Sequence, residues 1–205
     1  MARDRSPIVK QSRREGYALH PKAHKIMVKK TGIPGVHAHG RQSKPSMYSI
    51  QLREKQKVRR LYGLLEKQFA NLMKEAGRTK GQSGQVLLQL LERRLDNVIY
   101  RAGWSVSRRG ARQLASHGHL MVNGTRVDIP SIRVKPGDII TVRPASVKTY
   151  YFTQLDDVIK ETNQSNLSWI KSDPKKLTIT VTGLPKREEA DPDIKEQLIV
   201  EYYSR

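Results

Sequence analysis

The hydrophobic period of the sequence changes near residue 107, and this change constrains the fold more than any other feature. From residue 48 to residue 103, apolar side chains recur at the spacing of amphipathic helices. Short runs with the alternation of strands follow, and they are separated by the turn sequences Asn123-Gly124 and Lys135-Pro136-Gly137-Asp138. We therefore predict an α+β fold, in which a helical domain is joined to a small domain whose helices pack on a curled antiparallel sheet.

Three helices are expected from this periodicity. The first runs from Tyr48 to Gly77, where a glycine is suited to end a helix. The second covers residues 86–103, and the third is a short helix capped by the side chain of Ser107. We further expect strands at residues 120–128, 132–134, 139–142 and 177–185, one more helix between residues 151 and 176, and a terminal helix that begins at Asp191 or Asp193.

The charge of the chain is large, positive and unevenly distributed. Lys and Arg number 39 against 19 Asp and Glu, which gives a net charge of +20 at pH 7. Residues 1–60 carry +13, residues 61–150 carry +9 and residues 151–205 carry −2. Such a balance is typical of a protein that binds a polyanion, so nucleic acid is the expected partner. The acidic end is expected to face another partner, such as a basic protein.

The composition excludes several classes of site. The chain has no cysteine, so neither a disulfide nor a thiolate metal site can form. No apolar run reaches the length of about 20 residues that a membrane helix needs, and the basic start lacks the apolar segment of a secretory signal. We expect a soluble, cytoplasmic protein with no membrane partner. The segment GRTKGQSG lacks the context of a phosphate loop, so we predict no cofactor and no small-molecule substrate.

The first 48 residues show little periodicity and are rich in Arg, Lys, His, Gly and Pro. We interpret them as a basic, extended arm with one short helix near residues 12–17, whose order depends on its partner. An imidazole metal site is the alternative for His20, His24, His37 and His39, but RNA contacts or solvated histidines are favoured and no metal is predicted. We expect three parts, namely the arm (1–48), a mainly helical domain (49–92 with 151–205) and a small RNA-binding domain (93–150).

A known RNA-binding domain, named after small-subunit ribosomal protein four, is similar to the segment LLERRLDNVIYRAGWSVSRRGARQLASHGHLMVNGTRVDIPSIRVKPGDIITVR. Four further motifs resemble, in order, the bacterial-type ribosomal protein four family; they are SRREGYAL, PGVHAHG, SIQLREKQKVRRLYGLLEKQF and DPDIKEQLIVEYYSR. Because they extend over nearly the whole chain, it is identified as a member of this family. It departs from the family in lacking the cysteine-based zinc knuckle that many members carry in the arm.

The resemblance implies a structural constituent of the small ribosomal subunit. It implies a primary binder of the 5′ domain of 16S rRNA that nucleates subunit assembly, and a contribution to mRNA entry and to translational accuracy. The implied partners are small-subunit rRNA, mRNA, ribosomal protein five and other small-subunit proteins. Arg41 and Lys44 correspond to the family's basic loop at the mRNA entry channel, although the spacing differs there. Leu198, Ile199, Val200 and Glu201 lie in the region that packs near ribosomal protein five.

The predicted rRNA contacts are cations that form clusters without a compensating acidic face. Ser107 at the helix start belongs with them, because main-chain N–H groups there bind anions. The alternative is that these cations form a solvated face only. The predicted cations are Arg3, Arg5, Lys10, Arg13 and Arg14 in the arm, Arg53, Lys57 and Arg60 on the first long helix, and Arg108, Arg109 and Arg112, which we expect to point outward from the short helix.

Two other functions are compatible with a small RNA-binding domain of this kind. An RNA-modifying enzyme or a tRNA synthetase can carry the same small domain, but it needs a catalytic domain that this chain lacks the length and the residues to supply, so we predict no catalytic residues and no enzyme. A free-standing RNA chaperone or a translational repressor remains the alternative. Trp104 and Trp169 are expected to be packing residues, because neither lies in an array of exposed aromatic residues.

Gly110 is the second departure from the family. Many relatives have Glu at this third position of the short helix, where it completes a capping box. The loss of that carboxylate and the glycine itself are expected to cost about 1 kcal/mol, so that packing and RNA would hold the helix.

Overall fold

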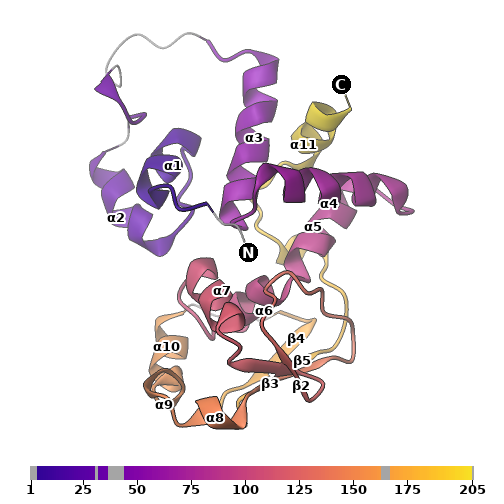
Figure 1. Ribbon diagram of the computed structural model, residues 1–205. Helices are drawn as coiled ribbons and strands as arrows, with labels where there is room; N and C mark the ends of the chain where they lie inside the picture. The colour runs from indigo at the N-terminus through magenta and orange to yellow at the C-terminus, as the bar shows by residue number, and fades with distance from the viewer. Residues whose placement is uncertain (1–3, 31, 37–43, 163–166, 205) are drawn as a thin grey trace. The chain divides into compact units, whose positions relative to one another are not determined.

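The computed structural model describes residues 4–30, 32–36, 44–162 and 167–204. The chain forms two compact units (Figure 1). Unit 1 comprises residues 1–87 and 193–205, and unit 2 comprises residues 88–192. The boundary falls inside one helix, α5 (Ser83–Glu92). Four residues named above lie outside the described part of the chain, namely Arg3, His37, His39 and Arg41.

Unit 1 is built of helices. They are α1 (Ile8–Glu15), α2 (Pro21–Lys29), α3 (Met47–Leu61), α4 (Glu66–Arg78), the start of α5, and α11 (Glu196–Tyr203). α11 packs along α3, and α1 contacts both α2 and α3. The apolar positions predicted from the helical period are buried, among them Val58, Leu61, Phe69 and Ala76. Fully buried Ile199 shows that the last helix closes this core.

The first long helix of the prediction is two helices. α3 ends at Leu61 and α4 begins at Glu66. Gly63 between them has φ of 66°, a left-handed conformation that glycine adopts without strain, and the main-chain N–H of Leu64 bonds to the carbonyl of Arg59. The apolar period continues across the break because α3 and α4 each bury an apolar face.

The arm is more ordered than predicted. It forms two helices, where one short helix was expected, and they pack against each other. Ser12, Leu19 and Ala23 are buried at this contact. Gly16, with φ of 64°, ends α1 and turns the chain toward α2. Ser12 and Ala23, one in each helix, have small side chains that give little hydrophobic signal, so the sequence pattern did not reveal the pair.

Unit 2 packs its helices on an antiparallel sheet, as predicted. The strands are β1 (Leu120–Val122), β2 (Thr125–Val127), β3 (Ile139–Val142), β4 (Ile170–Asp173) and β5 (Thr178–Val181), in the order β2-β1-β3-β5-β4. The helices are the end of α5, then α6 (Leu95–Arg101), α7 (Arg108–Ser116), α8 (Pro144–Val147), α9 (Tyr150–Thr153) and α10 (Leu155–Glu161). Trp104 and Trp169 are buried, which confirms that they are packing residues.

The turns of the sheet follow the sequence. Asn123 and Gly124 have φ of 49° and 79°, as a type I′ hairpin requires, and they join β1 to β2 in the register Val122↔Thr125. Gly137 has φ of 92° and lies in the turn before β3. The carboxylate of Asp138 accepts a hydrogen bond from the main-chain N–H of Lys135 and another from the side chain of Asn123, so this one residue joins the two turns.

The structure differs from the prediction both for the helix at residues 86–103 and for the strand at residues 132–134, and the two differences have one cause. The helix expected over residues 86–103 breaks between α5 and α6, where Arg93 lies in a turn and Arg94 is extended. The main-chain N–H of Val134 bonds to the carbonyl of Arg93, and that of Leu95 bonds to the carbonyl of Ile132. Residues 132–134 therefore form a single bridge to this break and are not a strand of the sheet.

Residues 151–192 belong to unit 2, whereas the sequence suggested that they belong with the helical domain. Phe152, Leu155 and Ile179 contribute to the core of unit 2, and β5 pairs with β3. The terminal helix begins at Glu196, after both of the predicted aspartates. Within the described residues, no helix is long and apolar enough to cross a bilayer.

Candidate nucleic-acid interface

The short helix α7 forms as predicted. The side-chain oxygen of Ser107 accepts a hydrogen bond from the main-chain N–H of Gly110 at 3.2 Å, which confirms the cap. Ala111, Leu114 and Ala115 are buried and attach the helix to the core of unit 2. Its first turn carries no acidic residue. The positive end of the helix dipole therefore lies beside arginines and has no carboxylate of the helix to offset it.

The three arginines of α7 lie in three environments. Arg109 is exposed, as predicted. Arg108 donates from Nε to the side-chain oxygen of Asn97 at 2.9 Å, and its guanidinium lies 4.5 Å from the centre of the Tyr100 ring. Arg112 has a side chain that is only 12% exposed, with Nη1 3.7 Å from a carboxylate oxygen of Asp96. The prediction that all three point outward is wrong for Arg112, because α6 supplies a buried acid that attracts it.

A buried polar network in and beside α6 contacts Arg108 and Arg112. Glu92 is 1% exposed and accepts two hydrogen bonds from Arg101 and one from the amide of Asn97. Arg94 and Asp96, both buried, form a two-bond ion pair. The amide of Asn97 thus links Glu92 on one side to Arg108 on the other. This network was not predicted from the sequence, although charged residues inside the most apolar segment of the chain are a signal of buried pairs.

The structure explains why a glycine occupies position 110. A Cβ at this position would lie 2.4 Å from the side-chain oxygen of Ser105, which is itself buried. Ser105 donates to the carbonyl of Ser107 and so supports the capping residue. The glycine is therefore more than the loss of a capping carboxylate, because it leaves room for a second serine under the start of α7.

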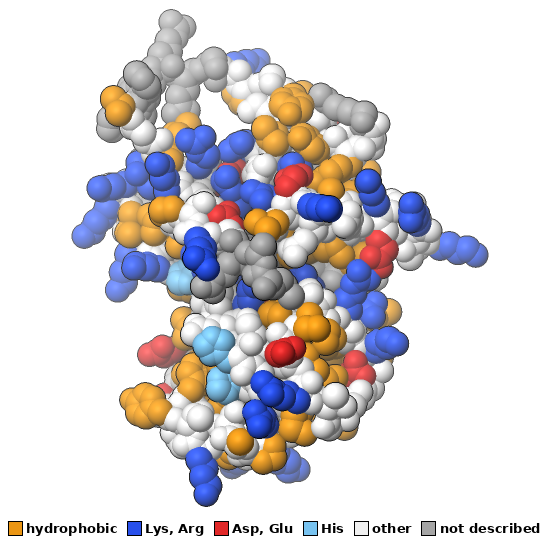
Figure 2. Space-filling view, in the orientation of Figure 1, with side chains coloured by type: hydrophobic (Ala, Val, Ile, Leu, Met, Phe, Trp, Pro, Cys, Tyr) orange, Lys and Arg blue, Asp and Glu red, His pale blue; other side chains and the backbone are white. Residues whose placement is uncertain are grey.

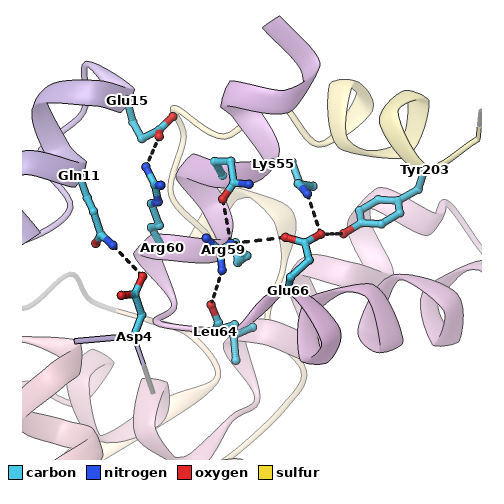
Figure 3. Close-up of polar contacts among 10 residues, drawn as sticks. Asp4, Gln11, Glu15, Lys55, Arg59, Arg60, Leu64, Glu66 and Tyr203 are labelled. Carbon is cyan, nitrogen blue, oxygen red and sulfur yellow. Dashed lines mark hydrogen bonds and ion pairs between the residues drawn. The ribbon is translucent and has the colours of Figure 1, made fainter. Parts of the chain in front are cut away.

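The arginines of α3 converge on an acid of α1. Arg53 Nη1 lies 3.1 Å from Glu15 Oε1. Arg60 binds the same oxygen, and Figure 3 shows the contact between Arg60 and Glu15. Burial raises the pKa of the Glu15 carboxyl above its ordinary value, although both arginines oppose this, and burial lowers the pKa of Arg60. Lys57 pairs with Glu54 and donates to the carbonyl of Asp193. These three predicted rRNA contacts therefore also join α3 to the rest of unit 1.

The cations of the arm are more open. Arg5, Lys10, Arg14 and Lys44 are exposed, whereas Arg13 donates to the carbonyl of Gly32. Blue side chains gather over the helices of unit 1 in Figure 2. His20 caps α2 by accepting from the main-chain N–H of Lys22. Among the described residues, no group of three or more potential ligands could hold a metal ion.

The last helix is fixed to α3 and α4 by polar contacts. The carboxylate of Glu66 accepts from Lys55 Nζ at 2.6 Å and from the hydroxyl of Tyr203 at 2.9 Å (Figure 3). Partial burial opposes ionisation of Glu66, but these two hydrogen bonds outweigh it and lower its pKa. Burial, together with the adjacent Glu66 carboxylate, raises the pKa of Tyr203. Lys55 also lies 4.6 Å from the centre of the Tyr202 ring.

A groove of about 1060 Å³ lies beside this helix in unit 1. Its apolar lining includes Met47 and Ile50 at the start of α3, and Leu198 and Val200 on α11. Of the predicted partner-binding residues, Leu198, Val200 and Glu201 are partly exposed. Ile199, the fourth, is buried inside unit 1 and does not form part of its surface.

Known proteins resemble the chain over its full length. Residues 3–92 match the family described as "Ribosomal protein S4/S9 N-terminal domain", and residues 93–140 match the "S4 domain". The "Small ribosomal subunit protein uS4" of Chlorobium phaeovibrioides is 48% identical over 206 residues, and that of Herpetosiphon aurantiacus is 49% identical over 211 residues. The "Small ribosomal subunit protein uS4A" of Symbiobacterium thermophilum is 46% identical over 211 residues. Each alignment covers 100% of both chains.

Proposed function

Because the chain belongs to the ribosomal protein S4 family, a family of small-subunit ribosomal proteins and not of enzymes, we propose that it binds the 5′ domain of 16S rRNA and nucleates subunit assembly. The observation that carries the proposal is the placement of Arg108 and Arg109 at the capped start of α7, on a helix fixed to the core of unit 2. Cations at the positive end of a helix dipole suit a phosphate.

The buried network of α6 supports this role. An arginine whose Nε edge is bonded to Asn97 and whose face lies on Tyr100 has little rotamer freedom left. A phosphate that meets this guanidinium therefore costs less side-chain entropy than one that meets a freely moving arginine. Recognition would depend on backbone shape more than on base sequence, because the major groove of duplex RNA is too narrow to read.

The finer roles have separate support. The groove beside α11, with Met47 60% exposed, is a surface on which a protein partner such as ribosomal protein five would bury apolar area. The acidic charge of residues 151–205 suits a basic partner. A contact with mRNA at the entry channel rests on the family resemblance and on the exposure of Lys44.

A salt titration of RNA binding tests the proposal. The full chain is titrated against a transcript of the 5′ domain of small-subunit rRNA in a filter-binding assay, and an unrelated structured transcript of equal length serves as control. We expect tighter binding to the 5′ domain, with an affinity that falls steeply as salt is raised and a log–log slope of several units. Equal affinity for the two transcripts, or a flat salt dependence, would contradict the proposal.

A further inference from the structure

Two histidines and two arginines, namely His117, His119, Arg126 and Arg143, lie around the turn at Gly118, just after the end of α7. The rings of His117 and His119 lie 6.0 Å apart. Gly118 has φ of 67°, and the guanidinium of Arg126 fills the space beside it, with Nε 2.7 Å from the place of a Cβ. The main-chain N–H of Arg143 donates to the carbonyl of His119 at 2.8 Å. Residues from α7, β2 and the end of β3 thus meet at one short segment.

This cluster is not required to complete α7. Residues 116–119 already donate hydrogen bonds to the main-chain carbonyls of its last turn, which are those of Arg112, Gln113, Leu114 and Ala115. In the part of the chain that the structure describes, neither Arg126 nor Arg143 forms an ion pair with a carboxylate. Two arginines beside two histidines, without an acid to neutralise them, attract an anion.

One histidine of the cluster is held in place. Nδ1 of His119 lies 3.0 Å from the hydroxyl of Ser146, and its ring meets Phe152 edge to face. Partial burial, with smaller contributions from His117 and Arg143, lowers the pKa of His119 below its ordinary value. Within the described part of the chain, no carboxylate opposes this lowering of the pKa of His119. His119 is therefore a neutral hydrogen-bonding group at pH 7, and it gains a charge when acid or a bound anion favours the proton.

We propose that His117, His119, Arg126 and Arg143 form a second phosphate-binding site for RNA, at the opposite end of α7 from Arg108 and Arg109. This inference rests on the proposed RNA binding and adds to it a second point of contact. A helix of nine residues separates the two ends by about 13 Å, a distance that one RNA backbone can span. A backbone held at both ends of α7 has its direction on unit 2 fixed, whereas one contact would leave it free to turn.

The test removes the two arginines from the full-length chain. In the variant Arg126→Ala with Arg143→Ala, we expect the affinity for the 5′-domain transcript to fall about tenfold and the log–log salt slope to decrease by about 1 to 2. The matched control is Lys160→Ala with Lys176→Ala, which removes the same charge from the same unit at exposed positions that are paired with aspartates. The control is expected to keep the slope of the wild type. Melting temperatures of both variants show that they are folded.

A second variant tests the histidines. The affinity of the wild type is expected to rise several-fold between about pH 7.5 and about pH 5.5, and His117→Gln with His119→Gln is expected to lose most of this rise. Unchanged affinity and salt slope in the double arginine variant, with normal binding by the wild type, would overturn the second site alone. Failure of the wild type to bind the transcript would overturn the proposed function and the second site with it.

Discussion

The arginines of α3 and those of α7 were predicted to have the same role, yet the structure gives them different partners. In unit 1, Arg53 and Arg60 share one oxygen of Glu15. The other oxygen of Glu15 and Nε of Arg60 are buried and have no hydrogen-bond partner among the residues that the structure describes. In unit 2, Arg108 and Arg112 lie on Asn97 and Asp96, which are in turn bonded to other groups. The first arrangement joins two helices of the protein, and the second fixes cations at the start of a helix.

The largest effect on stability is expected from a substitution of Asp96 in the buried network of unit 2. Asp96→Ala removes the acid from a buried ion pair and leaves Arg94 charged, buried and unpaired. We expect a loss of about 3–5 kcal/mol in the free energy of unfolding. Chemical denaturation measures it, with Lys160→Ala as the control, since exposed pairs of this kind contribute about 0–1 kcal/mol. A loss below about 1 kcal/mol would show that the network of unit 2 is no more important than a surface pair.

The next largest effect is expected from a comparison of RNA binding after substitution of an arginine in α7 or in α3. Arg108→Ala is expected to weaken binding to the 5′-domain transcript about tenfold, because it removes a pre-oriented guanidinium. Arg53→Ala is expected to affect RNA binding less and to increase hydrogen exchange in α1, because it removes one of the two cations that hold Glu15. The same filter-binding assay and amide exchange measured by mass spectrometry read out both effects. The reverse result, with the larger RNA effect from Arg53→Ala, would contradict the assignment of roles.

Gly110 tests the start of α7. Helix propensity alone predicts that Gly110→Ala stabilises the protein by about 1 kcal/mol. The short distance to Ser105 predicts instead a loss of about 1–2 kcal/mol, because a buried hydroxyl must move. Adding Ser105→Ala removes that hydroxyl and should convert the loss back toward a gain. A stabilising Gly110→Ala in the wild-type background would refute the steric account.

The smallest expected effect is a pH dependence in unit 1. Burial raises the pKa of Glu15, so the folded protein binds a proton there more readily than the unfolded chain does. This contribution to stability is full below the ordinary pKa of Glu and is lost as the pH rises through the folded pKa. The wild type should therefore gain stability relative to Glu15→Gln as the pH is lowered from about 7 to about 5. Denaturation curves of the two proteins at several pH values measure it, and a constant difference would contradict the raised pKa.

Local sequence signals predicted local structure well. The cap at Ser107, the type I′ turn at Asn123-Gly124 and the buried stripe of α7 were each predicted from a few adjacent residues, because their causes lie within those residues. The breaks at Gly63 and at Arg93-Arg94 were missed. The second break depends on hydrogen bonds to residues 132–134, which lie far away in the sequence and leave no trace in the local period.

The candidate site was predicted less completely than the fold. A count of charges identified Arg108, Arg109 and Arg112 as a cluster, but it did not reveal that Arg112 would turn to a buried aspartate. Nor did it reveal that Glu15 in the arm would meet two arginines of α3. Such pairings are set by which helices pack together, and that information is non-local. The surroundings of Gly118 and His119 were missed for the same reason, since Arg126 comes from β2 and Arg143 follows the end of β3.

Unit 1 is formed from both ends of the chain, so its two parts are synthesised at different times. Residues 88–192 form one continuous segment, so unit 2 can fold once that segment has left the exit tunnel. Unit 1 cannot be finished until residues 193–205 have been made, because Ile199 fills its core and Tyr203 bonds to Glu66. Until then, the apolar face of α3 that α11 covers is open to solvent. The part of the molecule that begins first is thus completed last, because the helix that closes unit 1 is made after every residue of unit 2.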